Sequence, residues 1–226
     1  PSQTVTTRAQ HGLPDKGFVF CCFNKHYKFT PMVFGAWMRL LTAVPGSVLW
    51  LSSMPAPVIE NLRREAAARG VAPERLVFAN HVESSAEHLA RHRQADLFVD
   101  TAPYNAHTTA ADALWAGLPV LTCAGETLAS RVAGSLLNTV GLSELITHTL
   151  ADYEALALKL AREPDMLASY RTRLAAQRTQ SPLFDMDRYV RALEAACLQM
   201  HERRHRGEPP QSFSVTLDRK STRLNS

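Results

Sequence analysis

The sequence has few cysteines, and none is placed as in a metal-binding or redox motif. Four cysteines occur among 226 residues, and no two are spaced as in C-x-x-C. Cys21, Cys22 and Cys123 lie in apolar runs. We therefore expect these three, together with Cys197, to be reduced thiols in the core of a cytoplasmic protein.

Long apolar runs and a basic body are also missing from the sequence. No apolar stretch approaches the about 20 residues of a membrane span, and the first residues do not resemble a signal peptide, so we expect no membrane association. The net charge is +4, but the segment from Glu202 to Ser226 holds six Lys or Arg and three Asp or Glu. Because the rest is close to neutral, we expect no nucleic-acid partner.

What the sequence does contain is an alternation of strand-like and helix-like segments. Apolar runs at 18–24, 48–51, 76–79, 97–100 and 119–123 are typical of buried parallel strands. Helix signals follow each run, for example Thr30-Pro31 and the capping-box pattern at 84–87. Five strand–helix units in succession predict an α/β fold with a Rossmann-like, doubly wound parallel sheet.

The predicted helices differ along the chain. The first shows one apolar stripe at helical spacing, formed by Val33, Phe34, Trp37, Met38 and Leu41. From about residue 151 the strands cease, and helices are predicted at 153–162, 166–179 and 186–202. We divide the chain into a linker at 1–16, one large lobe at 17–205 and a tail at 206–226, whose last residues could be non-native.

The segment from Asp100 to Gly117 carries the strongest functional signal. A buried strand ends at Asp100, and Thr108 or Thr109 is predicted to cap a helix that stops at Gly117. The free N–H groups and threonine hydroxyls of such a helix start bind phosphate. Asp112 shares that helix face and could accept hydrogen bonds from a ribose. The pattern favours a nucleoside diphosphate, although taken alone such residues are more often only a helix cap.

Polar residues also follow the other predicted strands, where the loops of a doubly wound sheet converge. They are Lys25, His26 and Lys28 after the first strand, His81, Glu83 and Ser84 after the third, Asn105 and His107 after the fourth, and Glu126 and Thr127 after the fifth. The ammonium of Lys28 could face a pyrophosphate as a point charge. A solvated loop lysine is an equally good interpretation.

Several motifs occur in one order along the chain. They are Phe23-Asn24-x-x-Tyr27-Lys28, the run 44–51, His107-Thr108-Thr109-x-x-Asp112-x-Leu114-Trp115-Ala116-Gly117, the run 125–133 and Ser181-Pro182-Leu183-Phe184. From about residue 6 to about 213, the sequence resembles the C-terminal catalytic lobe of the protein O-linked N-acetylglucosamine transferases. The resemblance implies one lobe of a two-lobed, inverting, metal-independent GT-B glycosyltransferase, which binds UDP-N-acetylglucosamine and modifies Ser and Thr of acceptor proteins.

The resemblance also implies roles for individual residues. Lys28 is similar to the family lysine that contacts the donor phosphates, so it is the implied catalytic residue. His107, Thr108 and Thr109 resemble the pyrophosphate-binding turn, and Asp112 resembles the acid on the ribose. The N-terminal catalytic lobe, the tetratricopeptide-type helical repeats and most acceptor-facing groups are implied to lie outside this chain, which alone is expected to be inactive.

A second group of residues is implied to surround the base. His88 resembles the histidine that packs near the uracil, and Arg91 resembles an arginine of the base pocket; without the resemblance, a histidine on the wet face of a helix is the better interpretation of His88. Lys25 stands where the animal enzymes have Gln, and Ser85 stands where they have Lys, so contacts near both stay open. Glu83 completes the predicted substrate-binding set.

No cofactor and no metal are expected. His88 and His92 are four residues apart on a predicted helix, but no third ligand accompanies them. Two alternatives remain: a SPINDLY-like protein O-fucosyltransferase that uses GDP-fucose, and a non-catalytic nucleotide-binding module. The features that distinguish the two transferases are His107, Asp112 and the run 125–131, which match the N-acetylglucosamine transferases better than the O-fucosyltransferases.

Overall fold

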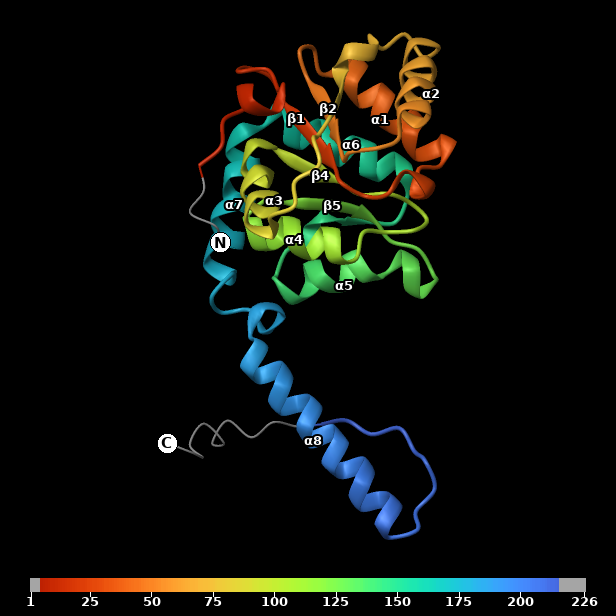
Figure 1. Cartoon of the computed structure of the whole chain (residues 1–226), viewed down its shortest axis with the longest axis vertical. Helices are drawn as coiled ribbons and strands as arrows, with labels where there is room; N and C mark the ends of the chain where they lie inside the picture. The colour runs from red at the N-terminus through yellow and green to blue at the C-terminus, as the bar shows by residue number, and fades with distance from the viewer. Residues whose placement is uncertain (1–4, 216–226) are drawn as a thin grey trace. The chain divides into compact units, whose positions relative to one another are not determined.

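The computed structural model describes residues 5–215 (Figure 1). Contacts within the chain divide it into a unit that ends at Arg178 and a second unit that begins at Thr179. The first unit holds the whole sheet. The second holds a short 3₁₀ helix, Pro182–Phe184, and the long helix α8, Met186–His205.

The sheet of the first unit has six strands, all parallel, in the order β3-β2-β1-β4-β5-β6. The strands are β1 (Val19–Cys22), β2 (Val48–Leu51), β3 (Leu76–Phe78), β4 (Leu97–Val99), β5 (Val120–Cys123) and β6 (Ile146–Thr147). The predicted α/β fold with a doubly wound parallel sheet is confirmed. The prediction of five strands missed β6, because two residues are too few to show a strand pattern.

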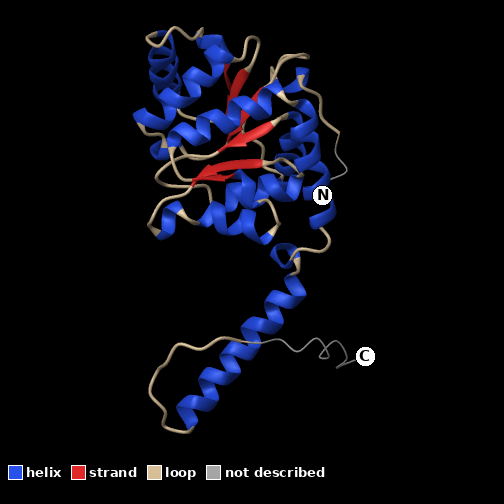
Figure 2. Ribbon diagram, turned by 180° about the vertical axis from the view of Figure 1, so that it is seen from behind, coloured by secondary structure: helices blue, strands red, loops and turns tan. Residues whose placement is uncertain are grey.

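Helices cover both faces of the sheet (Figure 2). They are α1 (Pro31–Ala43), α2 (Ala56–Ala67), α3 (Ser85–Arg91), α4 (Thr108–Ala116), α5 (Val132–Thr139), α6 (Leu150–Arg162) and α7 (Pro164–Gln177). α1 contacts α6, whereas α4 contacts both α3 and α5. This division follows from right-handed crossovers: the chain steps outward from β1 to β3, then returns to β4 and steps the other way, so its helices change face.

The core forms where the sequence predicts it. β1, β2, β4 and β5 are buried along their whole length, and so are the five residues of the α1 stripe. Deep in this core the indole N–H of Trp37 donates to the hydroxyl of Tyr153 at 3.1 Å, and that hydroxyl donates to the main-chain oxygen of Asp100 at 2.9 Å. Helices α1 and α6 are thereby tied to the end of β4.

Several local predictions were wrong. Cys197 is exposed on α8, so only the other three cysteines belong to the core. α7 begins at Pro164, two residues before the helix predicted at 166–179, since proline fits the first helical turn. The segment after Thr127 opens as a 3₁₀ helix, Leu128–Ser130, before α5 begins.

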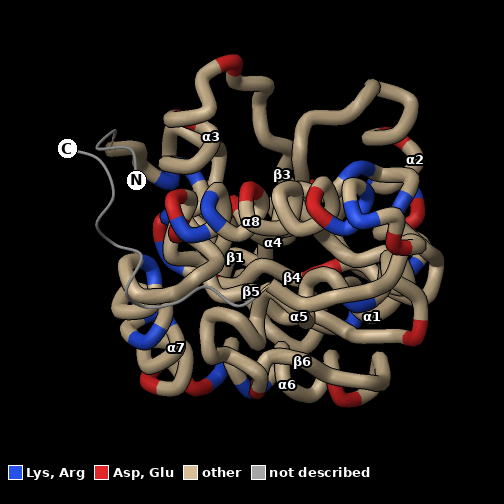
Figure 3. Tube along the Cα trace, turned by 90° about the horizontal axis from the view of Figure 1, so that it is seen from below, with Lys and Arg blue, Asp and Glu red and all other residues tan. Residues whose placement is uncertain are grey.

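Charged residues of both signs share the surface helices. Figure 3 shows Lys or Arg together with Asp or Glu on α2 and on α7, which is typical of solvated helices. Along residues 5–215, none of the helices combines the length and the apolar character needed to span a bilayer.

Gly17 and Gly46, which precede β1 and β2, both have a positive φ, but they differ in the space around them. An added Cβ at Gly17 (φ +118°) would collide with the main-chain oxygen of Gly46, whereas one at Gly46 (φ +73°) would meet no atom within 4 Å. We expect Gly46→Ala to lower the free energy of unfolding by about 1–2 kcal/mol, and Gly17→Ala by at least about 1 kcal/mol more. Urea unfolding measures both, and equal losses would contradict the predicted collision.

Candidate functional site

The strand order places the candidate site at one point of the sheet edge. β1 and β4 are neighbours, and the chain runs outward from them in opposite directions. In open α/β sheets, ligands bind outside the carboxyl ends of the strands at this switch point. The loops that follow β1 and β4 carry Lys28 and the segment from Asp100 to His107. The structure therefore brings together two loops that lie about 80 residues apart in sequence.

The buried carboxylate of Asp100 organises the loop after β4. Its Oδ1 accepts hydrogen bonds from the amides of Thr101 and Ala106, both at 2.7 Å, and from the side chain of Asn24 at 3.1 Å. Its Oδ2 accepts one from the Thr122 hydroxyl at 2.7 Å. Burial raises the pKa of Asp100 to about 6, and these hydrogen bonds oppose the rise. All four partners donate to its two oxygens, which favours the carboxylate form.

Asn105 holds the far end of the same loop. Its side-chain NH₂ donates to the main-chain oxygens of Thr101 at 2.9 Å and Cys123 at 3.2 Å. The main-chain oxygen of Asn105 in turn accepts a hydrogen bond from Lys28 Nζ at 2.9 Å, and that ammonium lies 3.9 Å from the centre of the Tyr104 ring. The predicted phosphate-binding lysine is thus fixed to the loop that leads to α4.

The electrostatic surroundings of Lys28 are mixed. The side chain is half-buried, and this burial lowers the pKa of Lys28, while the Asp100 and Cys22 side chains oppose the change. One ammonium hydrogen is engaged by Asn105. Since an ammonium has three donors, two remain for a ligand.

Helix α4 begins at Thr108, one residue earlier than a Thr108 cap predicts and two earlier than a Thr109 cap predicts, and no threonine caps it. Its N-cap is His107, whose main-chain oxygen accepts from the amides of Ala110 and Ala111, both at 3.1 Å. The amides of Thr108 and Thr109 have no acceptor among the residues that the structure describes. These two N–H groups lie at the positive end of the helix, as an anion site requires.

The two threonine hydroxyls are not equivalent. Thr108 is exposed, whereas Thr109 is half-buried and its hydroxyl donates to Oδ1 of Asn24. The expectation that both hydroxyls are available to a phosphate was therefore wrong for Thr109. His107 lies beside them, with its ring 5.4 Å from that of Tyr104.

The predicted base-pocket residues also meet. Nδ1 of His88 lies 2.6 Å from the guanidinium of Arg91, and its Nε2 lies 3.8 Å from the carboxylate of Asp112 on α4. Burial, with a contribution from Arg91, lowers the pKa of His88 to about 4, and burial raises the pKa of Asp112. Because Arg91 can only donate, the neutral ring accepts at Nδ1 and carries its hydrogen on Nε2.

The Phe23 ring packs against His88, His92 and Arg91. Its ring lies 5.8 Å from the ring of His88, 5.0 Å from that of His92 and 4.6 Å from the guanidinium of Arg91. His88 is thus packed against an aromatic side chain, and the alternative of a wet-face histidine is wrong. Arg91 is buried, with its second hydrogen bond to the main-chain oxygen of Asn80 at 2.9 Å.

Three predicted residues remain apart from these contacts. Lys25, Glu83 and Ser85 are exposed, and within residues 5–215 their side chains make no described hydrogen bond or ion pair. Lys25 precedes the 3₁₀ helix His26–Lys28, and Ser85 is the first residue of α3. Their predicted contacts to a ligand stay predictions.

The sequence interpretation missed Asn24 and Asp100 as site residues. Both are buried, and each follows a strand closely, where β1 and β4 meet. A polar residue that directly follows an apolar run was the available signal. That signal identifies Asn24 and Asp100 as site residues only once β1 and β4 are known to be neighbouring strands.

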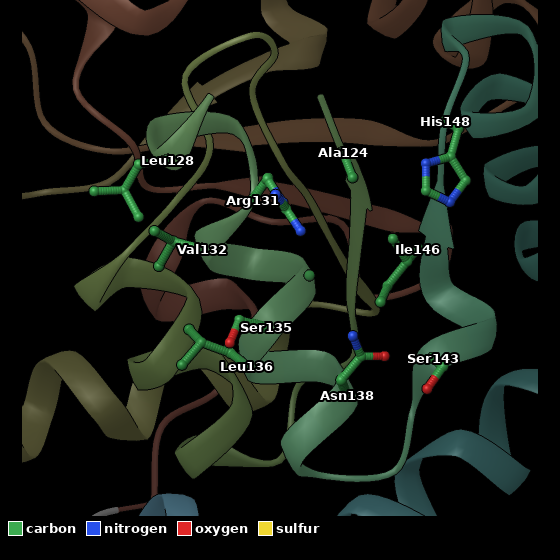
Figure 4. A pocket seen from close by; sticks show the side chains of 11 residues that line it. Ala124, Leu128, Arg131, Val132, Ser135, Leu136, Asn138, Ser143, Ile146 and His148 are labelled. Carbon is green, nitrogen blue, oxygen red and sulfur yellow. The ribbon is translucent and has the colours of Figure 1, made fainter. Parts of the chain in front are cut away.

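An open cavity of about 830 Å³ lies between α5 and β6 (Figure 4). Arg131 and His148 point into it from its two sides, with Ser135 on α5 below. Lys28 and Thr108 are not among its lining residues. The motif at 125–133 that contains Arg131 nevertheless adjoins the loop before α4, because the main-chain oxygen of Ala129 accepts a hydrogen bond from the amide of Asn105 at 2.9 Å. In the described part of the chain, no three His, Cys, Asp or Glu side chains are grouped as metal ligands.

The six-stranded parallel sheet with helices on both faces defines a lobe of the GT-B type. The chain belongs to glycosyl transferase family 41, whose model matches residues 1–193. It is 41% identical over 208 residues to a Caenorhabditis elegans protein named UDP-N-acetylglucosamine--peptide N-acetylglucosaminyltransferase; the match covers 92% of this chain but 18% of that protein.

Two further relatives agree with this assignment. A Hordeum vulgare protein, named Probable UDP-N-acetylglucosamine--peptide N-acetylglucosaminyltransferase SPINDLY, is 33% identical over 222 residues, covering 92% of this chain and 23% of that protein. A solved O-GlcNAc transferase mutant from Thermobaculum terrenum superimposes with a TM-score of 0.70 at 33% identity, covering 81% of this chain and 37% of that one. The chain therefore spans about a fifth of the length of these curated relatives.

Two histidines, the partly buried His88 and the fully buried His92, make stability depend on pH. Burial, with smaller contributions from His88 and Arg91, lowers the pKa of His92 to about 3, and His88 titrates near 4, against 6.5 when unperturbed. Between pH 6.5 and 4 the unfolded chain binds protons that the folded chain does not. We therefore expect the free energy of unfolding to decrease as the pH is lowered through this range, by up to about 1.4 kcal/mol per pH unit for each histidine.

Urea unfolding between pH 7.5 and 4.5 measures this slope, with His92→Phe as the comparison. The raised pKa of Asp100 acts with the opposite sign between about pH 6 and 4, but wild type and variant share Asp100. The variant should therefore show a shallower slope. Identical slopes would show that His92 is not the titrating group.

Proposed function

We propose that this chain is the donor-binding lobe of an enzyme that transfers N-acetylglucosamine from UDP-N-acetylglucosamine to Ser and Thr of proteins. The observation that carries the proposal is the pair of unpaired amides of Thr108 and Thr109 at the start of α4, on the loop that also holds Lys28. Two N–H donors, a helix dipole and an ammonium match a diphosphate in charge and in the hydrogen-bond donors they offer. Similarity to relatives named for this transfer supports the choice of donor.

The proposed role of these groups is to stabilise the leaving group. In the reaction, the acceptor hydroxyl oxygen attacks the anomeric carbon of the sugar while the bond from that carbon to the UDP oxygen breaks. The bonding electrons leave with UDP, so negative charge grows on the diphosphate. Donors that are already fixed, here Lys28 and the two amides, stabilise that charge more than the ground state. On this proposal the lobe needs no metal or cofactor for this step.

The uridine would lie beside α3 and the outer face of α4. Asp112 offers a carboxylate to the ribose hydroxyls, as an acceptor of two hydrogen bonds. His88 presents its Nε2–H and its ring face, and Arg91 holds it in this tautomer. The uracil ring would then pack against the flat, neutral imidazole of His88, whose orientation is fixed by Arg91.

Other parts of the reaction are assigned to the rest of the protein. We propose that the base that takes the acceptor proton, the protein-binding repeats and the second lobe belong to the about four-fifths of the relatives' length that this chain does not span. The chain alone is then expected to bind UDP without transfer. A cytoplasmic location is supported by free Cys21, Cys22 and Cys123.

Removal of either charged group should weaken nucleotide binding. We expect Lys28→Ala and Asp112→Ala each to lower UDP affinity at least about tenfold, because one loses a phosphate cation and the other a ribose acceptor. Isothermal calorimetry on the 226-residue chain measures this effect. Lys159→Ala and Asp165→Ala, which change exposed residues on α6 and α7, serve as charge-matched controls. Wild-type affinity in both site variants would refute the proposed site.

The nucleobase of the donor, uracil or guanine, distinguishes the two candidate transferases. We expect the chain to bind UDP at least about tenfold more tightly than GDP, since a purine has a different shape and edge from uracil. Calorimetry with both nucleotides, under one buffer, makes the comparison. Preference for GDP would instead support the O-fucosyltransferase alternative.

A further inference from the structure

Asn24 joins the three segments that build the candidate site. It lies two residues after β1 and is almost completely buried. Its side-chain nitrogen donates to Asp100 Oδ1 at 3.1 Å and to the Thr101 hydroxyl at 2.7 Å. Its side-chain oxygen accepts from the hydroxyl of Thr109, in the first turn of α4. One amide therefore bridges the ends of β1 and β4 and the start of α4.

The chemistry of the neighbours fixes which way this amide points. Oδ1 of Asp100 acts as an acceptor towards two main-chain N–H groups, so the Asn24 atom that contacts it must be a donor. The Thr101 hydroxyl gives its hydrogen to the main-chain oxygen of Tyr104 at 2.6 Å, so it can only accept from Asn24. Both contacts require the NH₂ group of Asn24 on that side. The carbonyl oxygen is then left for Thr109.

This orientation decides what Thr109 can offer to a ligand. A hydroxyl has one hydrogen, and that of Thr109 points to Asn24 rather than to the site. The main-chain N–H of Thr109 stays free, as does that of Thr108. The hydroxyl thus works as an anchor for the first turn of α4, and the amides are the donors.

We propose that Asn24 is a positioning residue for the donor diphosphate, acting through the Thr109 hydroxyl. The inference rests on the proposed function and adds to it a residue that touches no substrate. A helix end that is anchored before the ligand arrives holds its two N–H groups at fixed positions, so no ordering is needed when the diphosphate binds. Without the anchor, the first turn of α4 can fray and Thr109 can rotate.

The test compares UDP with uridine, because only UDP carries the diphosphate. The variants are Asn24→Ala, Thr109→Val and the double variant, all in the 226-residue chain, with affinities from calorimetry. We expect each single variant to bind UDP about tenfold more weakly than wild type, and uridine within about twofold of wild type. We expect the double variant to match the single ones, since all three lack the same bond.

Ser52→Ala is the matched control. The Ser52 hydroxyl donates to the main-chain oxygen of Asn24 at 3.3 Å, so it touches the same residue without the link to α4. Its UDP and uridine affinities should both equal those of wild type. A loss of UDP affinity in Ser52→Ala as large as that in Asn24→Ala would overturn the proposal, because any disturbance near Asn24 would then suffice.

Three results on the main variants would also overturn the inference. One is unchanged UDP affinity in Asn24→Ala; another is an equal loss for UDP and uridine, which marks a general structural role. The third is additive losses in the double variant, which would mean that the Thr109 hydroxyl meets the phosphate independently of Asn24.

Failure of the proposed function gives a different result, namely no UDP binding by wild type. If Asn24→Ala does not fold, Thr109→Val removes the same bond from a half-buried position with a side chain of equal shape. Unchanged UDP affinity in that folded variant would then overturn the inference by itself.

Discussion

The carboxylate of Asp100 is buried beneath the carboxyl ends of the strands, and the shape of the site depends on it. A buried carboxylate is tolerated only when donors surround it. Here the donors come from its own loop, from Asn24 and from Thr122 on β5. To supply its two amides, the loop after β4 must curl over the carboxylate, and this curl delivers the chain to His107 and the start of α4.

The remaining features of the site follow from that loop. Its main-chain oxygen at Asn105 receives the ammonium of Lys28, and its exit leaves two amides of α4 unpaired. α4 then carries Asp112 towards His88 on α3. Phosphate-type and ribose-type groups thus lie on one helix, one turn apart, which is a suitable arrangement for a nucleoside diphosphate. The proposed donor is drawn from the names of the relatives, and this geometry is the physical reason for proposing that the lobe holds it.

Much of the fold could be predicted because its signals are local. Thr30 followed by Pro31 caps α1 as expected, and the run 48–51 coincides with β2. β6 could not be predicted, since its two residues are held by pairing with β5 and not by a pattern of their own. Cys197 was misplaced because, unlike the other three cysteines, it lies in no apolar strand, and a position on a helix does not reveal whether anything covers it. Among site residues, the role of Thr109 was misjudged because its partner lies 85 positions away.

The sequence by itself determined the α/β class, the positions of five strands and the family, because these rest on periodicity and on motifs read along the chain. The tertiary structure alone decided that β1 and β4 are neighbours, that Asn24 bridges them to α4, and which donors of α4 remain free. The physical reason is that hydrogen-bond donors and acceptors are consumed by partners distant in sequence. What a polar side chain can still offer to a ligand is known only after those partners are in place.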